Sequence, residues 1–126
     1  MKKELRSTEG AAPVGAYSQG LVVGDFVYTS GAGPLHPETG EVVGDDVAAQ
    51  THQTMRNLGA ILAAHGLGFD DVIKATVHLQ HLQRDFAAFN EVYKSYFTQP
   101  YPVRTTVGSD LMNILVEIDF VAHKSA

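Results

Sequence analysis

The sequence predicts an α+β fold, one β-sheet with two helices on one of its faces. Strand-like stretches lie near both ends of the chain and in its middle, and two stretches of helical periodicity separate them. The order is therefore strands, helix, strand, helix, strands, as expected for helices gathered on one side of a sheet. No repeat or linker-like segment interrupts the chain, so residues 1–126 are expected to form a single domain.

The first strands are expected near the N-terminus. Residues 2–6 form a short candidate strand. Residues 17–23 and 26–30 form a β-rich pair around Gly24-Asp25, a reversed form of the usual hairpin dipeptide.

A loop and the first helix follow. Residues 31–40 contain three glycines and two prolines, which indicates a loop. Asp45 and Asp46 favour the start of a helix and Gly66 its end. The core positions expected at helical spacing are Ala48, Thr51, Met55, Leu58 and Leu62.

The second half of the chain predicts another strand, a second helix and two last strands. Residues 72–79 alternate as a strand, with Ile73, Ala75, Val77 and Leu79 on one face. A second helix is expected around Phe86, Phe89, Tyr93 and Tyr96 and ends before Pro100 and Pro102. Residues 103–107 and 114–121 are the last strands. The sheet face without helices is expected to carry Thr76, Thr106 and Glu117 among apolar residues, which suggests packing between subunits.

Composition narrows the classes of function. Apolar residues make up 44% and charged residues 18%, enough for a packed core. A net charge of −5 argues against a basic nucleic-acid-binding face. The absence of cysteine excludes disulfides and thiolate chemistry, and no apolar run can span a membrane. A cytoplasmic location is expected.

The most informative polar pair is Arg104 and Glu117. If the last two strands form a hairpin in which Val107 pairs with Ile114, Arg104 lies opposite Glu117 on the same face. The pair has two interpretations, a cross-strand salt bridge or a site in which arginine binds a carboxylate and glutamate handles water or a proton.

Other chemistries find weaker support in the sequence. Glu117 and Asp119 could suggest the paired carboxylates of a glycosidase or a hard-metal site. Two acids on one alternating strand are more typical of a solvent-exposed strand edge. His78 and His81 lack metal-ligand spacing. Ser18 lacks the nucleophile-elbow pattern, and the glycines from Gly31 lack the dinucleotide fingerprint.

Several segments together resemble the RidA/YjgF family, also called L-PSP, over nearly the whole chain. They are PVGAYSQ (13–19), VYTSG (27–31), PETGE (37–41), QTHQTMRNL (50–58), PVRTTV (102–107) and VEID (116–119). The resemblance implies a chorismate-mutase-like fold and a homotrimer with an active site at each of three subunit clefts. It also implies hydrolytic deamination of 2-enamine/2-imine acids, such as 2-aminoacrylate and 2-aminocrotonate, to 2-keto acids and ammonia, without a metal or organic cofactor.

The resemblance also implies roles for individual residues. Arg104 would anchor the substrate carboxylate, and Glu117 would position the attacking water. Backbone groups at Gly31 and Thr106 would hold the substrate, Tyr17 would wall the pocket, and Ser30 and Asn90 would add supporting contacts.

The chain departs from the family pattern at several positions. Thr106 stands where many relatives have cysteine, Ala32 replaces a frequent glutamine, and the loop over residues 108–113 is shorter than usual. Two other functions stay open: a ligand-sensing, regulatory or chaperone module of the same fold, and an RNA-binding protein or ribonuclease.

Overall fold

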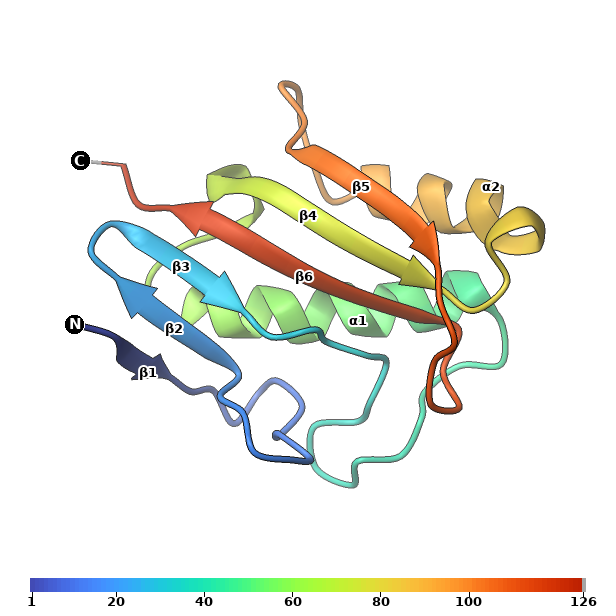
Figure 1. Cartoon of the computed structure of the whole chain (residues 1–126), viewed down its shortest axis with the longest axis horizontal. Coiled ribbons are helices and arrows are strands. Elements are labelled where there is room, and N and C mark those ends of the chain that lie inside the picture. Colours follow the sequence, from blue (N-terminus) through green and yellow to red (C-terminus); the bar gives the residue numbers. More distant parts are fainter. Residues whose placement is uncertain (126) are drawn as a thin grey trace.

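The computed structural model describes residues 1–125 and confirms the α+β fold (Figure 1). The elements are β1 (Lys3–Leu5), β2 (Gly20–Val23), β3 (Phe26–Thr29), α1 (Val47–Ala63), the 3₁₀ helix η1 (Phe69–Asp71), β4 (Val72–Leu79), α2 (Leu82–Lys94), β5 (Val103–Gly108) and β6 (Val116–His123). No helix among the described residues is long and apolar enough to cross a bilayer.

The six strands form one mixed sheet in the order β1-β2-β3-β6-β4-β5. β4 and β5 are parallel, and all other neighbours are antiparallel. The expected hairpin between the last two strands is therefore wrong, because β4 lies between β5 and β6. The short segment after β5 instead carries the chain across β4.

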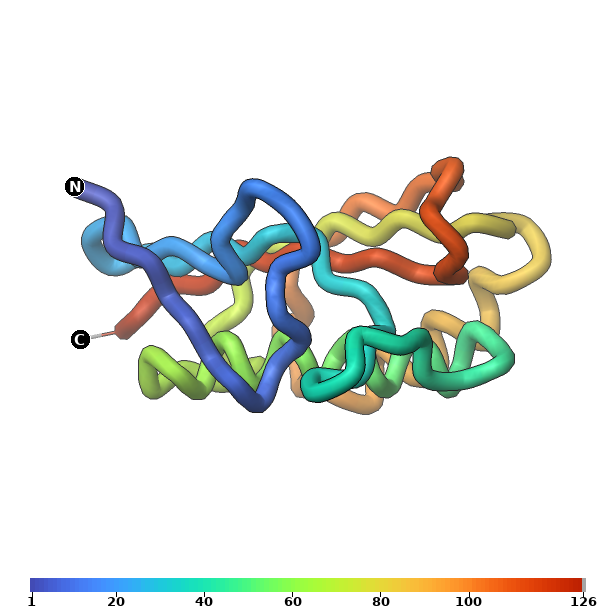
Figure 2. The backbone as a smooth tube through the Cα atoms, turned by 90° about the horizontal axis from the view of Figure 1, so that it is seen from below, coloured from blue at the N-terminus to red at the C-terminus, as the bar shows by residue number. Residues whose placement is uncertain are grey.

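Both helices cover the same face of the sheet, and the opposite face carries no helix within residues 1–125 (Figure 2). The core lies between these layers, where α1 residues such as Met55 and Leu58 are fully buried with Val77 and Ile118 of the sheet. Burial of each such side chain stabilises the fold by roughly 1.5–3 kcal/mol. We call the helix-free side the open face.

Local signals account for the element boundaries. Asp46 caps α1 by accepting a hydrogen bond from the Ala49 amide at 2.8 Å. Gly24 has φ of 59°, which a type II′ turn requires at its first central position and which glycine adopts without strain. α2 begins at Leu82, earlier than the aromatic residues alone predicted.

The open face mixes apolar and polar side chains, as the sequence predicted. Four residues on adjacent strands form a row across the open face, in the order Tyr28, Val121, Lys74 and Val103. Tyr28 is 45% exposed and Val103 is 68% exposed. The row thus leaves large apolar side chains in contact with solvent in a single chain.

Two side-chain assignments on the sheet differ from expectation. Ile73 is 44% exposed rather than buried with Ala75, because a β-bulge between Val72 and Lys74 shifts the strand by one residue. Thr106 pairs with the buried Val77 and therefore points to the helix side rather than to the open face.

Candidate active site

Arg104 lies on the edge strand β5 and points toward α2. Its partner on β4 is Ala75, which is fully buried under the helices, and paired residues point to the same side of a sheet. Asn90 on α2 accepts a hydrogen bond from Nη1 of Arg104 at 2.8 Å. We call Arg104, Asn90 and Thr106 the arginine half-site.

Three aromatic rings of α2 surround the guanidinium. Its Cζ atom lies 5.6 Å from the ring centroids of Phe86 and Phe89 and 4.8 Å from that of Tyr93. These distances allow cation–π attraction. Within residues 1–125, no carboxylate forms an ion pair with Arg104. The guanidinium is thus held in place by neutral groups and keeps donors available for an anionic ligand.

Two buried hydroxyl groups near Arg104 have no hydrogen-bond partner. They are the hydroxyl of Tyr93 and the Oγ1 atom of Thr106. Burial raises the pKa of Tyr93 to about 12, although the positive charge of Arg104 opposes this rise. Tyr93 therefore stays protonated at neutral pH and contributes a neutral ring beside the cation.

Glu117 lies on β6 and points to the open face, beside Gly31. Its neighbours in sequence, Val116 and Ile118, are fully buried on the helix side. Ile118 forms an isolated bridge with Ala32, with backbone hydrogen bonds of 2.8 and 3.0 Å. A Cβ atom on Gly31 would lie only 2.6 Å from Glu117 Oε2. The absence of a side chain at Gly31 therefore makes room for the Glu117 carboxylate.

Tyr17 and Ser30 lie close to Gly31. A concavity of about 490 Å³ is lined by Tyr17, Ser18, Tyr28 and Ser30 among others. A small cavity of about 40 Å³ brings Tyr17 and Ser30 together with Gly31. The Ser30 hydroxyl donates to the Ser18 carbonyl at 2.6 Å, so it fastens two segments of the fold. We call Tyr17, Ser30, Gly31 and Glu117 the glutamate half-site.

The structure does not bring Arg104 and Glu117 together. Arg104 pairs with Ala75 and Glu117 with His78, from opposite sides of β4. Arg104 and Glu117 are separated by two strand spacings across the sheet and by three residues along the strands, which places their Cα atoms about 14 Å apart. The two side chains also point to opposite faces of the sheet. The predicted cross-strand pair is therefore wrong, and one chain contains two separate half-sites.

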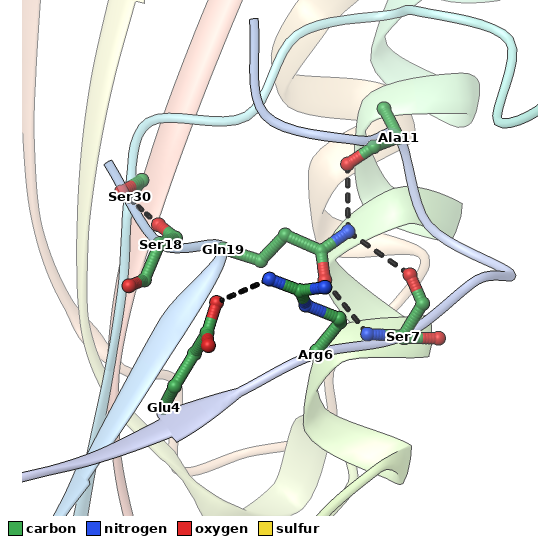
Figure 3. Close-up of polar contacts among 7 residues, drawn as sticks. All are labelled: Glu4, Arg6, Ser7, Ala11, Ser18, Gln19 and Ser30. Carbon is green, nitrogen blue, oxygen red and sulfur yellow. Dashed lines mark hydrogen bonds and ion pairs between the residues drawn. The ribbon is translucent and has the colours of Figure 1, made fainter. Parts of the chain in front are cut away.

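Sequence reasoning missed Gln19, a buried side chain beside the glutamate half-site. Its Oε1 accepts from the Ser7 amide at 2.7 Å, and its Nε2 donates to the carbonyls of Ser7 and Ala11 at 3.0 and 2.7 Å (Figure 3). The residue falls inside the PVGAYSQ segment, but no periodicity distinguished it from its neighbours. Only the three-dimensional path of residues 7–19 reveals its partners.

Polar side chains also hold the loop that follows β5. His78 Nδ1 lies 2.6 Å from the Ser109 hydroxyl, and Gln80 accepts from the Leu111 amide at 2.6 Å. On the same open face, burial raises the pKa of Asp119, while electrostatic interactions with His78 and Lys74 oppose the rise. Among the described residues, no three His, Asp or Glu side chains gather as a metal site would require.

Comparison with known proteins shows the family of the chain. The family model described as Endoribonuclease L-PSP matches residues 8–124. A RutC family protein from Saccharolobus solfataricus is 44% identical over 126 residues, which cover 98% of this chain and 99% of that protein. The chain belongs to the RidA/YjgF family. The resemblance seen in the sequence segments is thereby confirmed.

Two further relatives of this RidA/YjgF chain carry functional names. Reactive Intermediate Deaminase A, chloroplastic, from Arabidopsis thaliana is 42% identical over 125 residues, covering 97% of this chain and 66% of that protein. The crystal structure of Escherichia coli TdcF with bound serine matches with a TM-score of 0.90 and 37% identity, over 98% of this chain and 99% of that chain. The fold of this chain is therefore that of solved family members.

Proposed function

We propose that this chain hydrolyses 2-imino acids to 2-keto acids and ammonia. The observation that carries the proposal is the environment of Arg104. Asn90 and the aromatic rings of α2 hold its half-buried guanidinium, and no acidic side chain among the described residues pairs with it. Such a group suits a substrate carboxylate, because its planar fork can donate two parallel hydrogen bonds. A family relative named as a reactive intermediate deaminase and another crystallised with serine, which bears a carboxylate, support this assignment.

The chemistry requires water addition and proton transfer. 2-Aminoacrylate or 2-aminocrotonate first tautomerises to its imine, 2-iminopropanoate or 2-iminobutanoate. The oxygen of water then bonds to the imine carbon, and Glu117 takes a proton from that water. Return of that proton to nitrogen gives a carbinolamine. Transfer of the remaining hydroxyl proton to the amine then lets the carbon–nitrogen bond break as the carbonyl forms, which gives the 2-keto acid and ammonia. A positioned carboxylate contributes typically 10²–10⁴-fold to such proton transfers.

Backbone and aromatic groups complete the proposed site. The backbone at Gly31 lies beside Glu117 and can bind the substrate without a side chain in the way. Thr106 is proposed to act through its backbone, a role that does not need the cysteine found in many relatives. Tyr17, 45% exposed, is proposed to wall the pocket, and Ser30 and Asn90 to support their half-sites.

We propose further that the two half-sites come from different copies of the chain in a homotrimer. A single chain points Arg104 and Glu117 to opposite faces, so one small substrate cannot reach both within it. The exposed apolar residues of the open face supply surface for subunit packing, since such patches mark interfaces. The site then forms where the arginine half-site of one copy meets the glutamate half-site of another. A cytoplasmic, single-domain enzyme that clears reactive imines fits this assignment.

In the test, a serine/threonine dehydratase generates the imine in the presence of semicarbazide. Semicarbazide traps the imine as a semicarbazone before it hydrolyses, and semicarbazone formation is measured. The purified protein is expected to lower semicarbazone formation, and Arg104→Ala is expected to abolish this effect while the assembly stays intact. Full activity in Arg104→Ala would refute the assignment of the carboxylate anchor.

The alternative supported by a specific observation is a module that binds carboxylate ligands without catalysis. The serine in the TdcF structure favours it, because serine is not itself an imine. Saturable binding of serine or a keto acid, with imine hydrolysis equal to that in buffer, would select this alternative. The description of the family as an endoribonuclease adds a third assay, in which RNA cleavage that disappears in Glu117→Gln would support nuclease activity.

A further inference from the structure

Residues 6–19 follow a long path around one edge of the molecule. In Figure 2 this blue segment descends from the sheet to the level of α1 and then climbs above the open face. Within this segment Gly10 is buried, and a Cβ atom there would lie 3.0 Å from the Asn57 carbonyl of α1. The segment thus depends on close contact with the helix layer before it reaches the glutamate half-site.

The Gln19 carboxamide joins the two limbs of this segment. Gln19 is 4% exposed and bonds to both backbone groups of Ser7 on the descending limb and to the Ala11 carbonyl on the ascending limb (Figure 3). The amide therefore uses one acceptor position and both of its N–H donors on backbone groups. No other side chain type of this length offers an acceptor and two donors in one plane.

The same segment carries Tyr17. The Val14 amide donates to the Tyr17 hydroxyl at 3.1 Å, and the Tyr17 amide donates to the Gly15 carbonyl at 2.9 Å. The backbone carbonyl of Gln19 also accepts from the Ser30 amide at 3.0 Å. The carboxamide of Gln19 therefore holds the start of the segment, while hydrogen bonds at Tyr17 and at the Gln19 carbonyl hold the part that reaches Ser30.

We propose that Gln19 is a positioning residue of the active site, whose carboxamide holds residues 7–17 closed so that Tyr17 stands beside Ser30 and Gly31. This inference rests on the proposed function, in which Tyr17 walls the substrate pocket. Gln19 touches no reacting atom and acts only through the segment it holds. Its loss lowers the fraction of molecules with a formed pocket, and the apparent affinity falls by the same factor.

Two substitutions at Gln19 test the inference by different routes. Gln19→Glu keeps the size of the side chain but removes both donors and sets a carboxylate against the carbonyls of Ser7 and Ala11. Gln19→Met removes the hydrogen bonds without adding charge. Gln99→Glu is the matched control, because Gln99 is exposed and the change in charge is the same.

The first readout is amide hydrogen exchange, which does not depend on any activity. Exchange at Ser7 and Val14 is expected to rise at least tenfold in both Gln19 variants and to stay unchanged in Gln99→Glu, with the core strands protected in all of them. Unchanged exchange at both amides would overturn the inference whatever the protein catalyses.

The second readout separates positioning from a general structural role. KM for the imine is expected to rise about tenfold with kcat within about twofold of wild type, as expected if about one molecule in ten keeps the pocket formed. Faster exchange with an unchanged KM would overturn the positioning role. If the wild-type protein itself does not hydrolyse imines, the proposed function fails, and the dissociation constant for serine then replaces KM with the same expected rise.

Discussion

Gly31→Ala is expected to impair catalysis while leaving the fold nearly intact. The added methyl group would lie 2.6 Å from Glu117 Oε2 and 2.8 Å from Cδ, whereas ordinary contacts begin near 3.4 Å. The carboxylate must therefore move by about 0.8 Å, the difference between the two contact distances. Because misplacement of a reacting group by about 1 Å can cost 10²-fold, we expect kcat to fall about 30- to 100-fold.

Two other quantities should change little in this variant. KM is expected to stay within about threefold of wild type, because Arg104 binds the carboxylate from the other half-site. Stability is expected to change by less than about 1 kcal/mol, since the methyl group meets a flexible side chain at an exposed position.

The assay is imine hydrolysis in the presence of semicarbazide, together with urea denaturation. Gly68→Ala is the control, because Gly68 has φ of −137° and a Cβ atom there meets nothing within 4 Å. A Gly31→Ala protein with wild-type kcat would refute the requirement for a precisely placed Glu117. A large loss of stability would refute the view that only the carboxylate moves.

Further substitutions test the arginine half-site and the open face. Arg104→Lys keeps the charge but loses the bidentate fork, so KM is expected to rise at least about tenfold in steady-state kinetics; an unchanged KM would contradict carboxylate binding by the fork. Tyr93→Phe removes a buried hydroxyl without a partner and is expected to stabilise the protein by about 1 kcal/mol at pH 7. Burial raises the pKa of Tyr93 to about 12, so the wild-type protein should lose stability as the pH rises above 10.0, the ordinary pKa of a tyrosine. Urea titrations at pH 7 and pH 11 should therefore show a smaller loss of stability in Tyr93→Phe than in wild type. Burial raises the pKa of Asp119 against the effects of His78 and Lys74, so the folded state binds its proton more tightly than the unfolded chain. Asp119→Asn should therefore raise the melting temperature at neutral pH, and the gain should shrink as the pH falls through the raised pKa toward the ordinary aspartate pKa of 3.8. A gain independent of pH would contradict the assignment.

The sequence predicted the layers of the fold because its signals are local. Helical spacing, the cap at Asp46 and the turn at Gly24 depend on neighbouring residues, and the structure has each of them. The prediction that Ile73 shares a sheet face with Ala75 is wrong, because a β-bulge shifts the alternation of side chains along the strand and has no clear signal in the sequence.

The arrangement of the site depends on contacts between distant parts of the chain. Residues 103–107 and 114–121 are separated by a short segment, which favours a hairpin, yet β4 lies between β5 and β6. That insertion turns a predicted pair of residues into two half-sites on opposite faces. Arg104 and Asn90 do come together, but Gln19 finds partners 8 and 12 residues away that no periodicity indicates.

Mixing two inactive variants tests the shared site most directly. Arg104→Ala copies retain Glu117, and Glu117→Gln copies retain Arg104, so a mixed assembly can contain intact sites only if each site draws its two residues from different copies. Equal amounts are unfolded together, refolded and purified through two different tags, and imine hydrolysis is then measured. Selection through both tags removes the pure trimers, and each mixed trimer then holds one intact site in three, so we expect about one third of wild-type activity, whereas each variant alone stays inactive. Mixed assemblies with no more activity than the separate variants would contradict a site shared between copies.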